Sequence, residues 1–185
     1  ETVRKAAEMK SNLLILHHGM FWTGLRPFVG AHRSKLEILL QNDIAVYSSH
    51  IPLDLHPTFG NNVLLSRELG LHPSGDFAMY KGIPIGVRGE ADIATSEIVE
   101  RCRAFARKHG GDVIATGFDT TRRTRHWGMC SGAGASTETL EEARSLGVDT
   151  LIVGEGPHHT AVQADELGIV VIYAGHYATE TLGVA

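Results

Sequence analysis

Two histidine–acid pairs, each four positions apart, are the first candidates for chemistry in this sequence. His176 and Glu180 follow a β-branched apolar run that ends at Gly175, and His50 and Asp54 follow a similar run far upstream. On a helix, residues four positions apart lie on one face. An imidazole and a carboxylate held together at a strand end can share a metal ion. The alternative is that both are ordinary strand-to-helix turns.

Two further apolar runs also end in polar side chains. They supply His17 and His18 after residues 13–16, and Glu155, His158 and His159 after residues 151–153. In an open α/β sheet, ligands gather beyond the carboxyl ends of strands. The sequence therefore predicts that several strand ends deliver side chains to one site.

The order of apolar runs and helix-prone segments predicts an α/β fold with mixed sheets. The similar halves, about 1–80 and 81–185, indicate two intertwined, duplicated α-β repeats with the metal site between them, in a single domain of 185 residues. Residues 71–81 are rich in turn formers and are predicted to connect the halves. Two short matching motifs are the whole basis for the duplication.

Two local expectations concern the elements that position the histidines. Residues 12–16 form a short, continuous apolar run, which is typical of a strand buried on both faces. Pro52 argues against a helix at its position, so His50 and Asp54 are predicted to lie in a loop.

The glycine-rich stretch CSGAGAS at 130–136 leads into a predicted helix. Free N–H groups at a helix N-terminus can cradle an anion, which makes Gly132 and Gly134 candidates for substrate contact. The stretch is not GxGxxG and lacks a P-loop lysine. Close packing of strand on helix explains it equally well.

Composition narrows the functional classes. The chain is 43% hydrophobic and 21% charged with a net charge of -4, so no basic surface for nucleic acid is expected. No apolar run approaches the ~20 residues of a membrane span.

Only Cys102 and Cys130 are present, and they predict reduced thiols in a cytoplasmic protein. The basic turn at Arg122, Arg123 and Arg125 is either a solvated turn or a small anion site.

Four stretches resemble one family, the Nif-three-like dinuclear metal-centre proteins, also known as GTP cyclohydrolase I type 2 homologues. The resemblance covers nearly the whole chain. The stretches are LLILHHGMFW at 13–22, the YSSHIPLDLHP and FGNN run at 47–62, TLIVGEGPHHTAVQADELGI at 150–169, and VVIYAGHYATE at 170–180.

The resemblance implies two divalent metal ions per chain, held by His17, His18, Asp54, His176 and Glu180, with Glu180 as the bridging carboxylate. Three imidazoles and two carboxylates suit Zn, Fe(II), Mn, Co or Ni. His50, Glu155 and His159 are the candidates for orienting these ligands.

Two ions that share a carboxylate and a solvent molecule would activate that water as a nucleophile. The sequence therefore predicts a metal-dependent hydrolase of the GTP cyclohydrolase I type 2 kind, with His159 or His50 as the catalytic proton carrier. The alternative is a non-catalytic metal-binding or interaction protein that forms a ring. A nucleic-acid-associated ring would depend on the basic turn alone.

The resemblance also implies a homohexamer, built as a trimer of dimers, and a small-molecule, nucleotide-like substrate. Members of the family usually carry a further segment before the first helix and continue beyond the position of Glu180. The chain is therefore expected to lack the N- and C-terminal ends of the family domain.

Overall fold

The computed structural model describes all 185 residues and divides the chain at the bond between His50 and Ile51. Residues 1–50 form one compact unit, the N-terminal unit, and residues 51–183 form the other, the C-terminal unit. The predicted repeats of about 1–80 and 81–185 differ from these units, and the duplication stays a prediction. No helix in either unit is both long enough and apolar enough to cross a bilayer.

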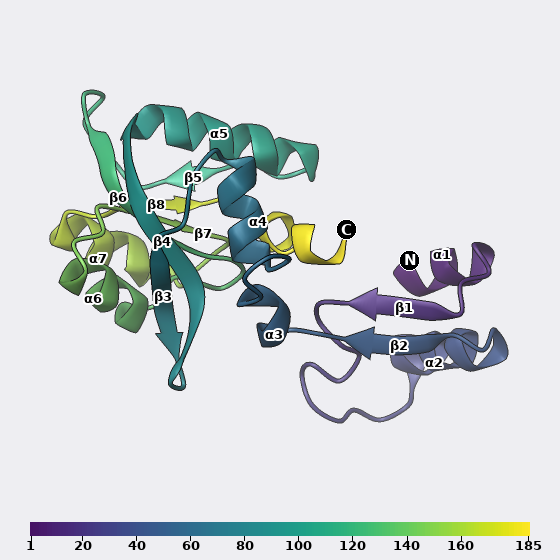
Figure 1. Cartoon of the computed structure of the whole chain (residues 1–185). Helices are drawn as coiled ribbons and strands as arrows, with labels where there is room; N and C mark the ends of the chain where they lie inside the picture. The colour runs from purple at the N-terminus through teal and green to yellow at the C-terminus, as the bar shows by residue number, and fades with distance from the viewer. The chain divides into compact units, whose positions relative to one another are not determined.

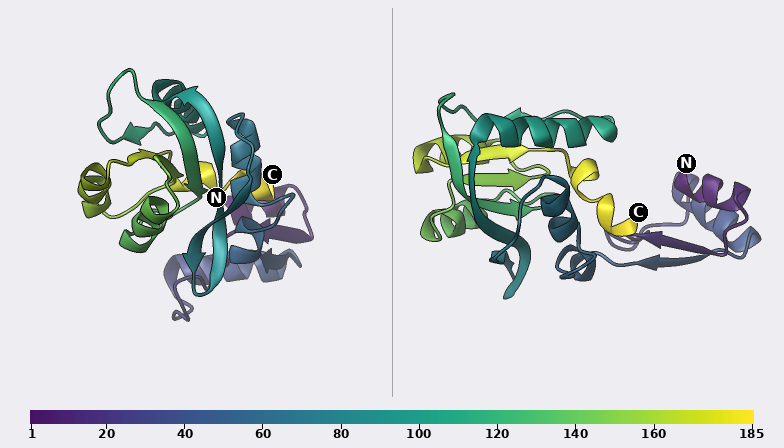
Figure 2. Two further views of the ribbon diagram at one scale, coloured as in Figure 1. Left: turned by 60° about the vertical axis from the view of Figure 1, so that its left-hand side comes forward. Right: turned by 45° about the horizontal axis from the view of Figure 1, so that its top comes forward.

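The N-terminal unit is a βαβ arrangement with one preceding helix (Figures 1 and 2). Strands β1 and β2 pair in parallel, so that Leu16 lies opposite Ser48. Parallel neighbours need a crossover connection, which α2 provides. The elements are α1 (Thr2–Glu8), β1 (Leu13–Leu16), α2 (Gly30–Gln41) and β2 (Ala45–Ser48).

Strand β1 is covered on one face only. Leu14 packs against the small core that contains Leu39, whereas Leu13 and Ile15 are 49% and 54% exposed. The prediction of a strand buried on both faces is wrong. Side chains of a strand alternate between faces, and the helices of this unit cover only one face of its two-stranded sheet.

The C-terminal unit is a mixed six-stranded sheet in the order β3-β4-β6-β7-β8-β5. The neighbours β6, β7 and β8 run parallel, and the outer strands pair antiparallel. The predicted α/β class with mixed strand directions is therefore confirmed. In chain order the elements are α3 (Ile51–Asp54), α4 (Asn61–Glu68), β3 (Gly75–Tyr80), β4 (Ile83–Ala94), α5 (Thr95–Lys108), β5 (Ile114–Ala115), β6 (Arg123–Cys130), α6 (Thr137–Ser145), β7 (Thr150–Val153), α7 (His159–Leu167), β8 (Val170–Tyr173) and α8 (His176–Thr179), followed by a 3₁₀ turn at Leu182–Val184.

Helices cover both faces of the central strands (Figure 1). Ile152 of β7 belongs to the cluster that includes α4 and α5, and its neighbours Leu151 and Val153 belong to the cluster beneath α6 and α7. All three side chains are 0% exposed. The alternation explains why β7 reads as a continuous apolar run, as expected of a strand between two layers of helices.

Residues 71–81, which were predicted to be a turn-rich connector, contain strand β3 instead. Phe77 is 1% exposed and lies opposite Gly86 of β4. The turn formers Pro73, Gly75 and Gly82 suggested a connector. The strand forms because pairing with β4 extends the sheet and buries Phe77, a non-local gain that outweighs local preference.

A chain of buried hydroxyl groups crosses the C-terminal unit. Thr95, Thr124 and Thr150 are all 0% exposed, and their Oγ1 atoms are 3.1 Å and 2.8 Å apart in that order. Thr150 donates to Oδ1 of Asp149 at 2.8 Å. The second oxygen of Asp149 accepts the backbone N–H groups of residues 125 and 126, at 2.9 Å each. Asp149 therefore fastens β6 to β7.

We expect Asp149→Ala to lower the free energy of unfolding by about 2 kcal/mol, because three donors lose their acceptor and one of them is buried. Urea denaturation measures this change. Asp165→Ala, at an exposed position of α7, is the control and should change stability by less than about 0.5 kcal/mol. Equal stability of the two variants would contradict the role given to Asp149.

Candidate metal centre

The loops after β6, β7 and β8 form one edge of the C-terminal unit. Because the three strands are parallel, their carboxyl ends meet at that edge. Backbone hydrogen bonds join the loops: Glu155 N–H donates to Gly132 O at 2.8 Å, and Gly175 N–H donates to Gly154 O at 2.9 Å. This edge is where the sequence predicted that ligands would gather.

His176 lies between two carboxylates at this edge. Helix α8 begins at His176, directly after Gly175, which confirms the predicted helical turn. The imidazole Nδ1 is 2.8 Å from Glu155 Oε1, and Nε2 is 3.1 Å from Glu180 Oε2. A proton on Nδ1 that is donated to Glu155 would leave Nε2, beside the carboxylate of Glu180, as the ligating atom. An imidazole and a carboxylate placed in this way can bind the same cation.

The backbone of Gly132 lies directly against this pair, and we call it the glycine floor. Its φ is +64°, and a Cβ there would lie 2.0 Å from Glu180 Oε1 and 3.2 Å from His176 Nε2. Its N–H donates to Thr179 Oγ1 at 3.0 Å, which ties the loop to α8. Only glycine leaves room for the carboxylate to lie against the backbone.

Gly134 and the start of α6 were predicted as parts of an anion cradle. A Cβ on Gly134 would lie 2.3 Å from the carbonyl oxygen of Cys130, so this glycine permits a tight turn. Ser136 caps α6 by accepting the N–H of Thr139 at 3.1 Å. These contacts explain the glycine-rich loop by packing and capping, and substrate contact at Gly132 and Gly134 stays a prediction.

Asp54 approaches the same loop from α3. The prediction that Asp54 lies in a loop is wrong: Pro52 stands in the first turn of a short helix, where a backbone N–H has no partner to lose. The carboxylate is buried, and its Oδ1 accepts Asn61 Nδ2 at 2.9 Å and Ser131 Oγ at 3.3 Å. Ser131 precedes Gly132, so Asp54 lies at the loop that also carries the floor of the His176–Glu180 pair.

Two buried asparagines hold this arrangement. Asn61 Oδ1 accepts the N–H of Gly183 at 2.8 Å, so its amide nitrogen must face Asp54. Asn62 donates to the carbonyls of Ile85 at 2.7 Å and Asp54 at 3.3 Å, and it accepts the N–H of Ser131 at 2.7 Å. Sequence reasoning gave neither residue a role, because two asparagines at a helix start are usually read as capping residues.

The pKa of the Cys130 thiol is affected by the negative charges around this loop. The pKa of Cys130 is raised to about 12, first by burial and then by the neighbouring carboxylates of Asp54 and Glu180. Three of the five predicted ligands therefore surround the loop after β6, within the C-terminal unit alone.

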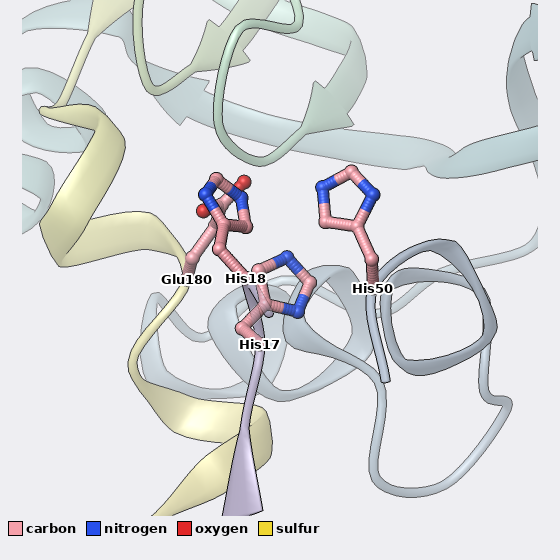
Figure 3. Close-up of side chains that lie close together, drawn as sticks. All are labelled: His17, His18, His50 and Glu180. Atoms are coloured by element: carbon pink, nitrogen blue, oxygen red, sulfur yellow. The ribbon is translucent and has the colours of Figure 1, made fainter. Parts of the chain in front are cut away.

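The N-terminal unit gathers three imidazoles (Figure 3). His17 and His18 follow the end of β1, and His50 follows β2, whose carboxyl end lies beside that of β1. The ring centroids of His17 and His50 are 4.7 Å apart, as are those of His18 and His50, and those of His17 and His18 are 5.0 Å apart. Each ring offers a nitrogen, and these nitrogens lie within 4.8 Å of one another. Both adjacent histidines can serve one site because the strand has already ended.

His17 is oriented by the backbone of the same unit: its Nδ1 lies 3.1 Å from the carbonyl oxygen of Ser49. A protonated Nδ1 that donates to this carbonyl would fix the tautomer and leave Nε2 as the ligating atom. His159 is exposed at the first residue of α7. The proton-carrying roles of His159 and His50 stay predictions.

The basic residues 122–125 open strand β6 and are engaged within the fold. Arg122 Nη2 donates to the carbonyls of Asp149 at 3.1 Å and Gly168 at 2.7 Å. Arg123 Nε donates to Asp92 Oδ1 at 2.5 Å, and Arg125 lies 3.8 Å from the same oxygen. These contacts give the arginines structural roles in the C-terminal unit.

The donor groups fit divalent transition-metal ions. Imidazole nitrogens are the ligands that Zn, Fe, Co and Ni prefer, whereas Ca²⁺ and Mg²⁺ take oxygen ligands. The glycine floor, which leaves the Glu180 carboxylate against the His176 ring, is a further feature expected of an ion site.

Comparison with known proteins gives consistent matches over the whole chain. The Duf34/NIF3 (NGG1p interacting factor 3) family matches residues 1–185. A Pyrococcus abyssi protein named GTP cyclohydrolase 1 type 2 homolog is 39% identical over 184 residues, covering 100% of this chain and 72% of the relative. A Deinococcus radiodurans protein of the same name is 34% identical over 186 residues, covering 100% of this chain and 68% of the relative. The solved structure of protein ybgI, described as of unknown function, superposes with a TM-score of 0.85 at 32% identity, covering 98% of this chain and 71% of that one.

Proposed function

Because the chain belongs to the Duf34/NIF3 family, we propose that it holds two divalent transition-metal ions and is a metal-dependent hydrolase of the GTP cyclohydrolase I type 2 kind. One observation carries the metal part of the proposal: chain segments far apart in sequence bring Asp54, His176 and Glu180 to one loop. The proposed ligands are His17, His18, Asp54, His176 and Glu180.

The three imidazoles of the N-terminal unit are a second, separate observation that supports a metal site. They stand at two adjacent strand ends, and their nitrogens are close enough together to share an ion. Glu180 is the proposed bridge between the two ions. The resulting set contains three nitrogen and two carboxylate ligands, which favours Zn, Fe(II), Mn, Co or Ni.

Bound ions would supply Lewis acidity and an activated water. The protein's own groups have separate tasks. Glu155 holds Nδ1 of His176 and so keeps Nε2 directed at the site. Asn61 and Ser131 hold Oδ1 of Asp54, which prevents the carboxylate from rotating away. His50, next to His17 and His18, is placed either to complete the ligand set or to carry a proton to the leaving group.

The name shared by the two relatives mentions GTP, a guanine nucleotide. The reaction proposed for this chain is hydrolysis of a C–N or P–O bond. A water activated by two ions can hydrolyse either kind of bond. We propose a nucleotide as the first substrate to test for this chain.

Elemental analysis of the purified protein tests the metal centre. We expect about two transition-metal ions per chain, as in other two-metal sites, and loss of most of this metal in the His176→Ala/Glu180→Ala double variant. A His158→Ala/Glu166→Ala variant, altered at two exposed residues of the α7 region, is the matched control and should retain the metal. A folded parent that takes up no Zn, Mn or Fe(II) on titration would refute the proposal.

Turnover requires a second experiment. Metal-loaded protein should convert GTP, lose this activity on treatment with a chelator, and regain it when the ion is restored. If the loaded protein binds two ions but converts no nucleotide, the metal centre stands and the hydrolase assignment fails.

A further inference from the structure

The loop between β1 and α2 carries an aromatic side chain that packs directly on the imidazole cluster. The indole of Trp22 stacks on His18, with ring centroids 4.8 Å apart and planes 18° from parallel. Its ring centroid also lies 4.0 Å from that of His50, with the planes tilted by 58°. The side chain is still 55% exposed. One residue therefore contacts two histidines that come from different strand ends.

We infer that Trp22 is a positioning residue of the proposed metal centre, which holds the ring of the proposed ligand His18 in the orientation that binds the ion and fixes the neighbouring ring of His50. The inference rests on the proposed function. An imidazole ligates only when a nitrogen lone pair points at the ion, and the torsion that turns the ring has a broad energy minimum. A nearly parallel stack restricts that torsion, because rotation would separate the two faces.

The exposure of Trp22 argues against a purely structural role. A large aromatic residue that served only to fill a core would be buried, as Trp127 is at 0% exposure. Trp22 contributes little to the core of its unit, which is built from Ala6, Leu39 and Ile44. Its main contacts with rings are those to the histidines.

Phe21 provides a matched control in the same loop. Its side chain is 47% exposed, close to the value for Trp22, and its ring packs on His32 at 5.7 Å. His32 is not among the proposed ligands. Replacing Phe21 therefore removes an exposed aromatic residue of this loop without removing a stack on His18 or His50.

Equilibrium dialysis with Co²⁺ on the full chain measures the expected effect. Trp22→Leu should weaken Co²⁺ binding about tenfold, in the range found when groups that orient metal ligands are removed. It should also change the visible absorption of the bound Co²⁺, which reports ligand geometry. Phe21→Leu should change neither. Trp22→Phe, which keeps a flat ring, should restore most of the affinity and the spectrum.

Fluorescence gives an independent readout, because the chain contains only two tryptophans. In a Trp127→Phe background Trp22 is the sole indole, and its emission should be quenched by Co²⁺ with the midpoint found by dialysis. The dialysis experiment does not need this background, so poor folding of Trp127→Phe would leave the test intact.

The outcomes separate the inference from the proposed function. If the parent binds Co²⁺ and Trp22→Leu binds it with the same affinity and spectrum as Phe21→Leu, the positioning role of Trp22 is overturned and the metal centre stands. If the folded parent binds no Co²⁺, Zn²⁺ or Fe²⁺, the proposed function itself fails.

Discussion

Gly132→Ala is expected to weaken metal binding by about 100-fold while the chain stays folded. The new methyl group would lie 2.0 Å from Oε1 of Glu180 and 3.2 Å from Nε2 of His176. Glu180 is the more easily displaced of the crowded groups, because its carboxylate is the end of a flexible side chain. The carboxylate would therefore swing away, and the site would lose its proposed bridging ligand. Elemental analysis and Zn²⁺ titration measure the loss.

Gly147→Ala is the control for backbone strain. Gly147 has a φ of +72°, close to the +64° of Gly132, but a Cβ there meets nothing within 4 Å. Both variants place an L-residue in the left-handed region and should lose about 1 kcal/mol of stability. Only Gly132→Ala should lose metal. Equal metal content in the two variants would show that the glycine floor has no part in binding.

The largest expected effect on stability is that of Asn62→Ala, at about 3 kcal/mol, since it leaves two buried backbone groups and one part-buried backbone group without their partner. These groups are the carbonyls of Ile85 and Asp54 and the N–H of Ser131. Asn62 is 0% exposed, so water cannot replace the lost amide without a rearrangement. Urea denaturation measures the change in the free energy of unfolding.

Asn42→Ala is the comparison for Asn62→Ala. Asn42 makes one side-chain hydrogen bond, to the carbonyl of Ile38 at 2.8 Å, and it is exposed. Its removal should cost about 0.5 kcal/mol. If the two variants were equally stable, the buried amide of Asn62 would not fasten α3 and β4 to the loop after β6.

Several parts of the candidate site could be predicted because their signals are local. A continuous apolar run followed by a histidine marks a strand end, and this is where His17 and His18 lie. The four-residue spacing of His176 and Glu180 predicts a shared helix face, and the two side chains are in contact. The wider choice of ligands came from the resemblance of whole stretches to a family.

The parts that could not be predicted depend on contacts between distant residues. Ser131 and Asp54 are 77 positions apart, and no local pattern indicates that their side chains meet. The close approach of Gly132 to Glu180 is equally non-local. Local rules also misled at Pro52, because the rule against proline in helices does not apply to the first turn.

The chain of threonine hydroxyls has a direction. An ionised carboxylate can only accept, so Thr150 must give its proton to Asp149. Thr124 must then donate to Thr150, and Thr95 to Thr124, so all three O–H dipoles point the same way. One charge at the end of a strand thereby orders the hydroxyls of the interior. An asparagine at 149 could both donate and accept, and the row of protons would be left with two nearly equivalent arrangements.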